Sequence, residues 1–182
     1  MSETAIHELA TRFLERPDTP TVLIIDGRSG SGKTTLAGEL ARELTVATGS
    51  TPRIIGMDEL YPGWDGLAAG SAWLPVALAR GRYRSYNWLT EEFGAEVTID
   101  PGELLIAEGC GSLTSASLQA ARTRGGAYGV WIECPDDLRR DRALTRDGDM
   151  FAPHWERWAA QERSHFGAAR PVSHAHEVVH VS

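Results

Sequence analysis

The residues best suited to chemistry lie in one glycine-rich stretch, residues 27–35, which reads Gly-Arg-Ser-Gly-Ser-Gly-Lys-Thr-Thr. This stretch fits the pattern G-x-x-x-x-G-K-[ST], in which glycines let successive backbone N–H groups point inward around a phosphate. Lys33 is the one lysine of the chain, since all other basic residues are arginine. A lysine supplies a compact point charge rather than a planar fork. The stretch therefore predicts a phosphate-binding loop, and the alternative is a glycine-rich turn that binds nothing.

The chemistry of such a loop assigns a role to each part of it. We expect the ammonium of Lys33 to face solvent before a nucleotide binds and then to reach its β- and γ-phosphates, while the Thr34 hydroxyl serves Mg²⁺. The residues that we assign to ATP binding in this loop are Gly27, Ser29, Gly30, Ser31, Gly32, Lys33, Thr34 and Thr35.

Two carboxylates each follow a short apolar run that reads as a buried strand. Asp58 ends the run 53–57, and Glu108 ends the run 104–107. Because the carboxyl ends of parallel strands face the ligand crevice, we expect both carboxylates to lie near the phosphates. Glu108 would then support the metal, and Asp58 would accept the proton of an acceptor alcohol. The alternative for either residue is a loop carboxylate that caps a helix.

Three arginines share one face of a predicted helix within residues 136–150. Arg139, Arg142 and Arg146 stand at positions i, i+3 and i+7. Such a face could close as a lid over transferring phosphates and neutralise developing charge. We assign Arg139 to ATP binding and the other two to charge stabilisation. The alternative is a solvated helix whose arginines pair with its own aspartates.

Half of the aromatic residues (6 Trp, 4 Tyr and 4 Phe) lie between residues 61 and 93. Flat rings with polar edges suit a planar or ring-shaped substrate. The alternative is that these rings form a small core beneath residues 59–100, which read as an insertion. The candidate substrate-binding residues are Tyr61, Trp64, Arg84, Tyr86 and Trp88.

The elements that must position these residues follow from periodicity. A helical stripe covers residues 4–16, and a second one follows the glycine-rich stretch and ends near Gly49. Short apolar, β-branched runs predict strands at 21–26, 53–57, 104–107, 128–133 and 177–181. Alternating strands and helices predict an α/β fold with a mainly parallel sheet.

Composition narrows the class of protein. The 182 residues carry a net charge of −7, with 42% apolar and 24% charged residues, as in an ordinary globular domain. We expect one cytoplasmic domain over residues 1–182, because a run of about 18 apolar residues and a secretory signal are both missing. An acidic chain without a basic block argues against nucleic-acid binding. Two cysteines are too few for a disulfide scaffold. The C-terminal histidines His174, His176 and His180 lack a fourth metal ligand.

Taken together, the motifs resemble P-loop kinases of the uridine kinase type. The resemblance rests on residues 27–35, on Met-Asp-Glu-Leu-Tyr at 57–61, on Leu-Ile-Ala-Glu-Gly at 105–109, and on the arginine-rich segment that ends at Asp147. It implies that the aspartate matching Asp58 is the base for a nucleoside 5′-hydroxyl and that Tyr61 lines the nucleoside site. It also implies that the lid arginines hold the phosphates.

The resulting interpretation is a three-layer α/β/α P-loop NTPase with a five-stranded parallel sheet of order 2-3-1-4-5. We expect it to transfer the γ-phosphoryl of ATP, with Mg²⁺, to an alcohol that is nucleoside-like. The same chemistry on a pantothenate-like, sugar or antibiotic hydroxyl is one alternative, and a regulatory ATP-binding protein without an acceptor is another. A guanine-specific switch is excluded, because its Asn-Lys-x-Asp motif needs a second lysine. The oligomeric state stays open.

Overall fold

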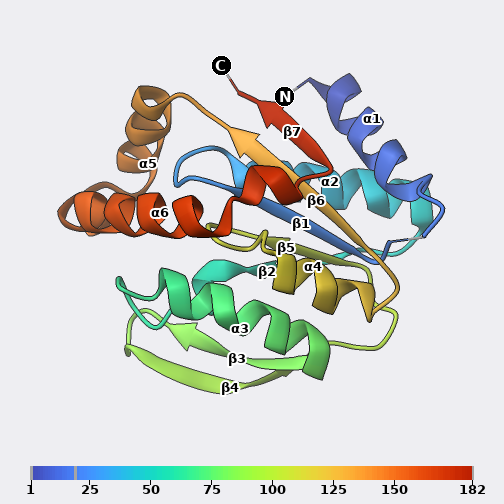
Figure 1. Cartoon of the computed structure of the whole chain (residues 1–182), viewed down its shortest axis with the longest axis horizontal. Coiled ribbons are helices and arrows are strands. Elements are labelled where there is room, and N and C mark those ends of the chain that lie inside the picture. Colours follow the sequence, from blue (N-terminus) through green and yellow to red (C-terminus); the bar gives the residue numbers. More distant parts are fainter. Residues whose placement is uncertain (1, 19, 182) are drawn as a thin grey trace.

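Five short parallel strands form the centre of the computed structural model, which describes residues 2–18 and 20–181 (Figure 1). They run in the order β2-β5-β1-β6-β7, and every neighbouring pair is parallel. This is the predicted order 2-3-1-4-5, which is confirmed together with the α/β class. The strands are β1 (Val22–Gly27), β2 (Arg53–Gly56), β5 (Leu105–Glu108), β6 (Ala127–Glu133) and β7 (Glu177–His180).

Helices cover both faces of this sheet. The α-helices of the described residues are α1 (Glu3–Leu14), α2 (Lys33–Thr48), α3 (Leu67–Arg80), α4 (Ser115–Arg122), α5 (Asp136–Phe151) and α6 (Trp155–Ala169). Alternate residues of β1 divide between two apolar clusters. Leu23 joins the cluster of α1 and α2, whereas Ile24 joins the cluster that includes residues of α3, α4 and α6. A strand buried on both faces must be apolar throughout, which explains its uninterrupted run of aliphatic side chains.

The chain changes direction sharply where the glycine-rich loop, which the sequence predicts to bind phosphate, meets α2. Gly32 has φ 97° and Gly49 has φ 74°, so both glycines that flank α2 take a left-handed backbone conformation. Glycine adopts that conformation without the steric cost that a Cβ imposes. The helix therefore begins at Lys33, which places the lysine in its first turn.

Residues 59–100 fold into a helix and a hairpin of their own. After the short 3₁₀ turn η1 (Met57–Glu59) come α3 and an antiparallel pair, β3 (Arg82–Asn87) with β4 (Glu92–Thr98). Figure 1 shows α3 and this hairpin beside the edge of the sheet that β2 forms. Periodicity did not predict α3, because its sequence is apolar on nearly every side and contains Pro75. Two further 3₁₀ turns flank α6: η2 (Ala152–His154) joins α5 to α6, and η3 (Pro171–His174) follows α6.

Across residues 2–18 and 20–181, no helix has the length and apolar character needed to cross a membrane.

The packing of α2 on the sheet predicts a clear difference between two of its residues. Leu40 is fully buried, whereas Val46 is 84% exposed on the same helix. We expect Leu40→Ala to lower the free energy of unfolding by about 2–5 kcal/mol, because it removes buried methyl groups and leaves a cavity. Val46→Ala should change it by about 0.5 kcal/mol or less. Urea unfolding of both variants measures this, and an equal effect would contradict the packing described.

Candidate functional site

A cavity of about 600 Å³ opens at the carboxyl ends of the central strands. One end is formed by the phosphate-binding loop and by side chains that follow β2 and β5, and the other end is walled by aromatic rings. Lining residues that the sequence singled out are Ser29, Gly30, Gly32, Lys33, Thr34, Asp58, Tyr61, Trp64, Trp88, Glu108 and Arg146. Lining residues that the sequence analysis did not assign to the site are Gly109, Cys110, Asp147, Met150, Phe151 and Trp158.

Helix α5 packs directly on the phosphate-binding loop. Gly30 has φ 80°, and a Cβ built on it would lie 1.8 Å from the backbone oxygen of Arg139. A side chain at position 30 would thus meet another backbone segment as well as an unfavourable conformation. Glycine is required here by the approach of α5 and not only by the turn itself.

Lys33 folds back across the loop. Its Nζ donates to the backbone oxygen of Arg28 at 3.0 Å and lies 3.5 Å from the Cys110 sulfur. The residue is 8% exposed, so the expectation of a solvent-facing ammonium is wrong. Burial lowers the pKa of Lys33, but its surroundings, which include Cys110 and the Glu108 and Glu162 carboxylates, raise the pKa above its usual value overall. The lysine is held charged at the rim of the cavity.

A buried aspartate at the end of β1 ties the loop to the neighbouring strand. Asp26 accepts hydrogen bonds from the backbone N–H groups of Gly27 (2.7 Å), Gly111 (3.0 Å) and Leu113 (2.8 Å). Burial raises its pKa to about 7, although these three donors and Lys33 act in the opposite direction. Asp26 therefore positions the start of the loop against the segment after β5.

Thr34 and Glu108 form a pair in the cavity. The Thr34 hydroxyl donates to Glu108 Oε1 at 3.0 Å, which joins the first turn of α2 to the end of β5. Burial raises the pKa of Glu108, while Lys33 and the Thr34 hydrogen bond oppose the rise. A hydroxyl beside a carboxylate is a donor set that Mg²⁺ accepts, with phosphate and water oxygens completing its coordination. In the described part of the chain, no cluster of three or more His, Cys, Asp or Glu side chains offers a fully protein-made metal site.

Asp58 lies on η1, across the cavity from the loop. Its side chain is open to solvent in the cavity, but surrounding protein still desolvates the carboxyl and raises its pKa, while Lys33 and Arg146 oppose this. The Asp58 backbone oxygen accepts a hydrogen bond from Trp88 Nε1 at 2.8 Å. The turn that carries the carboxylate is thus fastened to the hairpin β3–β4.

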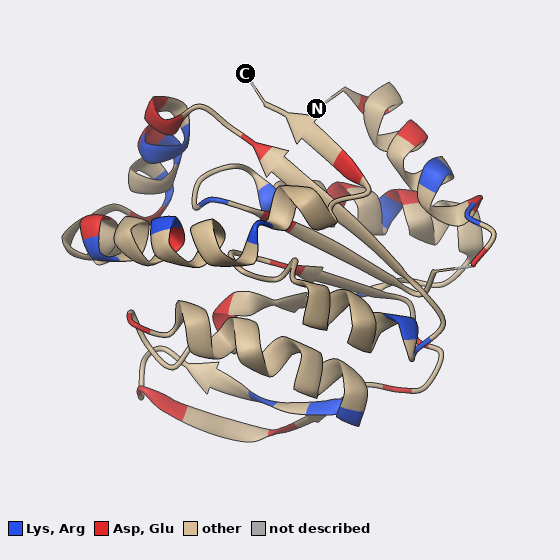
Figure 2. Ribbon diagram, viewed as in Figure 1, with Lys and Arg blue, Asp and Glu red and all other residues tan. Residues whose placement is uncertain are grey.

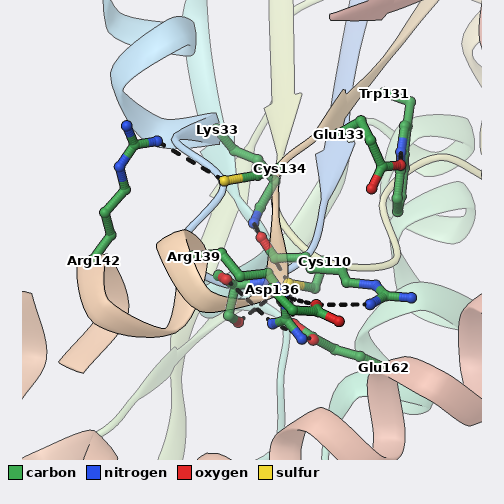
Figure 3. A network of polar contacts seen from close by, with 11 residues as sticks. Lys33, Cys110, Trp131, Glu133, Cys134, Asp136, Arg139, Arg142 and Glu162 are labelled. Carbon is green, nitrogen blue, oxygen red and sulfur yellow. Dashed lines mark hydrogen bonds and ion pairs between the residues drawn. The ribbon is translucent and has the colours of Figure 1, made fainter. Parts of the chain in front are cut away.

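The three arginines of α5 do not share one role. Arg146 lines the cavity, where its guanidinium makes two hydrogen bonds to Asp147 (2.7 and 2.8 Å). Arg142 points toward Cys134, 3.9 Å from its sulfur, and does not line the cavity (Figure 3). Arg139 turns inward instead, and Ala143, one turn further along α5, is also buried.

Arg139, which the sequence assigned to ATP binding, already has its guanidinium bound to protein. It donates to Asp136 at 2.6 Å and to Glu162 at 3.1 Å, and it lies over the ring of Trp155, 5.1 Å from its centroid. This corrects the expected phosphate contact. The Arg139 side chain can be buried because the buried Glu162 carboxylate compensates its charge.

That carboxylate, Glu162 of α6, is the most important residue that the sequence interpretation missed. It is 1% exposed and accepts hydrogen bonds from the backbone N–H of Ser29 (2.6 Å), the Cys110 thiol (3.4 Å) and Arg139 (Figure 3). No local pattern marks Glu162, because its partners are distant in sequence.

The two cysteines are free and follow β5 and β6, on opposite sides of β1.

The aromatic end combines predicted and unpredicted rings. Tyr61, Trp64 and Trp88 line it as expected, and Trp158 joins them from α6. Trp64 stacks on His154 with ring centroids 4.2 Å apart, and the Tyr61 hydroxyl donates to the Cys110 backbone oxygen at 2.6 Å. These contacts hold the rings in fixed orientations.

Two predicted substrate residues lie outside the cavity lining. Tyr86 packs against Trp88, 5.4 Å between centroids, and so supports the wall from behind. Arg84 faces elsewhere: its guanidinium donates to the backbone oxygens of Phe93 and Gly94 on β4. The expected substrate contact of Arg84 is therefore corrected, because its guanidinium is held on the backbone of β4, and the pairing of β3 with β4 is irregular between Arg84 and Tyr86.

The pairing of Arg139 with Glu162 generates a prediction about stability. Arg139→Ala leaves a buried carboxylate without its cation, so we expect the free energy of unfolding to fall by about 3–5 kcal/mol. Arg142→Ala removes an exposed arginine from the same helix and should change it by about 0.5 kcal/mol or less. Thermal and urea unfolding test both variants. Equal, small effects would mean that Arg139 is free for another role.

Comparison with known proteins gives matches at the level of structure. No protein-family model and no curated protein matches the sequence. A candidate fructose transport system kinase from Silicibacter sp. TM1040 superposes with a TM-score of 0.61 at 19% identity, covering 98% of each chain. YFH7 from Saccharomyces cerevisiae, a candidate P-loop kinase with a circular permutation, gives 0.59 at 10% identity, covering 100% of this chain and 99% of that one. The chain therefore shares the overall fold of these two structures, built on a five-stranded parallel sheet with helices on both faces.

Proposed function

We propose that this chain transfers the γ-phosphoryl group of ATP to a hydroxyl of a small-molecule acceptor. The observation that supports this best is that one cavity contains a phosphate-binding loop, a hydroxyl–carboxylate pair suited to Mg²⁺, and a separate carboxylate beside an aromatic wall. A protein that only bound ATP would need the first two features and not the third. Positioning of the reactants and stabilisation of charge supply most of the catalysis in phosphoryl transfer. The groups in this cavity are of the types that both tasks require.

At the donor end, ATP with Mg²⁺ would supply the phosphoryl group and the charge that offsets it. The backbone N–H groups of the loop and the start of α2 would bind the phosphates. Lys33 would exchange its contact with the Arg28 oxygen for a phosphate oxygen. Thr34 and Glu108 would hold the metal, the carboxylate orienting the hydroxyl or a bound water.

At the acceptor end, Asp58 would take the proton of the attacking hydroxyl. Its raised pKa brings the carboxyl closer to the range in which a base is effective near neutral pH. Arg146 would stabilise the negative charge that develops between donor and acceptor. The backbone contact from Trp88 keeps Asp58 fixed with respect to the aromatic wall.

We propose that the C-terminal part of the 136–150 segment acts as the lid. Its beginning is anchored, because Arg139 is buried and bound to Glu162. Gly148 interrupts the helix with φ 49° and ψ −132°, close after Arg146 and Asp147. Motion at such a glycine would move the residues that follow it, which include Met150 and Phe151 of the cavity lining, while the helical turns that carry Arg139 and Arg146 stay anchored.

The charges of the cavity favour an uncharged acceptor. Within the described residues, its basic side chains are Lys33 and Arg146, and Arg146 is already paired with Asp147. The aromatic end therefore offers no free cation for a carboxylate. A nucleoside fits the flat rings, as the resemblance to uridine kinases implies, and its 5′-hydroxyl is the acceptor that we propose. A sugar hydroxyl is the second candidate, since a carbohydrate ring also packs on tryptophan.

The test is a screen of acceptor-dependent ADP release with ATP and Mg²⁺. Nucleosides and neutral sugars form the first set, pantothenate-like and aminoglycoside alcohols the second, and sugar acids the third. We expect a compound of the first set to accelerate ADP release strongly. Slow ATP turnover that no compound changes would support a regulatory ATP-binding protein instead.

Lys33 provides a prediction about the donor end. Lys33→Ala should lower kcat by at least about 100-fold, because it removes a cation aimed at the transferring charge. Lys33→Arg keeps the charge but not the compact ammonium, so we expect it to restore less than about a tenth of the activity. Circular dichroism and an unfolding curve on both variants separate loss of chemistry from loss of fold. Near-normal turnover in the alanine variant would remove Lys33 from the mechanism.

Asp58 provides a prediction about the acceptor end. Asp58→Asn should lower kcat by about 10²–10⁴-fold, the usual contribution of a positioned base, and leave ATP affinity nearly unchanged. The base must be deprotonated, so the wild-type rate should fall as pH drops through the raised pKa of Asp58. That acid limb should disappear in the variant.

The same pair of measurements can contradict the role of Asp58. Asparagine caps a turn as well as aspartate does, so a purely structural Asp58 would tolerate the change. Unaltered turnover, or an unchanged acid limb in Asp58→Asn, would exclude this residue as the base.

A further inference from the structure

A second cavity, of about 440 Å³, lies between α3 and the β3–β4 hairpin, away from the phosphate-binding loop. Three arginines line it: Arg80 at the end of α3, and Arg82 and Arg84 on β3. Figure 2 shows this gathering of basic residues where α3 ends and β3 begins. The proposed phosphoryl transfer uses none of them.

These arginines exceed the acidic groups around them. Glu96 is the one acidic residue lining the cavity in the described part of the chain, and its contact with Arg82 is loose at 3.6 Å. The Arg80 side chain is exposed at the end of α3 and makes no hydrogen bond or ion pair with the described residues. Arg84 is held by two backbone oxygens at 2.7 and 2.8 Å, so its guanidinium is already oriented. The chain as a whole carries a net charge of −7, so this local excess of positive charge stands out.

The rest of the cavity lining is apolar. Trp73 and Val76 of α3 are 40% and 43% exposed, although both are large apolar side chains. Trp73 meets Phe93 edge to face, with ring centroids 5.2 Å apart. Covering such surface with an apolar body is favourable at roughly 25 cal/mol per Å². Guanidinium groups beside exposed rings suit a ligand that is both anionic and apolar.

We propose that this cavity binds a small organic anion, a carboxylate or phosphate carried on a ring-shaped apolar body. The inference does not depend on the proposed kinase activity. The second cavity lies next to the turn that carries Asp58 in the first one. Leu60, which lines the second cavity, follows the turn η1 immediately in the chain. Tyr83, which also lines it, donates to the Glu59 carboxylate of the same turn at 2.9 Å. A bound anion would thus rest against the back of that turn.

The test is isothermal titration of the full chain with three probes of the same shape. These are 1-naphthoate, 1-naphthyl phosphate and the uncharged 1-naphthylmethanol. We expect at least one anion to bind about tenfold or more tightly than the alcohol, because charge-assisted hydrogen bonds are the stronger ones. The order of the two anions identifies the preferred head group.

Variants assign the binding to this cavity. Arg80→Glu should weaken binding of the preferred anion by about tenfold or more. Arg42→Glu makes the same charge change at an exposed position of α2 and should alter the affinity by less than about threefold. Trp73→Ala should also weaken it, and Trp64→Ala, in the first cavity, should not. Unfolding curves confirm that each variant is folded.

Three results would overturn the proposal. One is the absence of measurable binding for both anions. Another is equal binding of the anions and the alcohol. The third is loss of binding in Trp64→Ala or Arg42→Glu that matches the loss in Trp73→Ala or Arg80→Glu.

Discussion

The phosphate-binding loop is held between two buried carboxylates, and the rest of the site depends on this arrangement. Asp26 binds the start of the loop to the segment after β5, through the N–H groups of Gly27, Gly111 and Leu113. Glu162 binds the next turn of the loop to α5 and α6. A buried carboxylate is tolerable only when donors or cations surround it, so both residues fix their partners firmly. The loop, the segment after β5 and the start of α5 therefore keep one relative position.

This arrangement also explains how Lys33 can be buried before any nucleotide binds. The ammonium is surrounded by a backbone oxygen and by the field of several carboxylates. Two carboxyl groups of the cavity, Asp58 and Glu108, are desolvated, which raises their pKa values, while Lys33 opposes the rise. The charged groups of the cavity thus shift one another's pKa values. Under the proposed function, a phosphate that entered the loop would meet a cation already in place and would not have to order it.

Much of the fold was predictable, because it follows from local patterns and a few topological rules. Apolar runs identified β1 and its neighbours, and the position of parallel strand ends placed Asp58 and Glu108 on the cavity. The arginine face of α5 was not predictable in the same way. Periodicity shows that Arg139 and Arg146 share a side of the helix, but it does not show which of the two is buried. Arg139 is the buried one because Glu162 lies beside it, whereas Arg146 lines the cavity. Arg84 was misplaced for a similar reason, since the direction of a hairpin face depends on its distant packing partners.

The hairpin β3–β4 closes its hydrogen bonds within itself and is a sheet apart from the central one. It nevertheless supplies Trp88 to the aromatic wall of the first cavity. The two ends of this cavity consequently belong to separate parts of the fold. Substitutions in the hairpin can reshape the wall without altering the register of β1 and β5, on which the phosphate end is built. Under the proposed function, such a division would let substitutions in the hairpin change the acceptor preference while the donor end is retained.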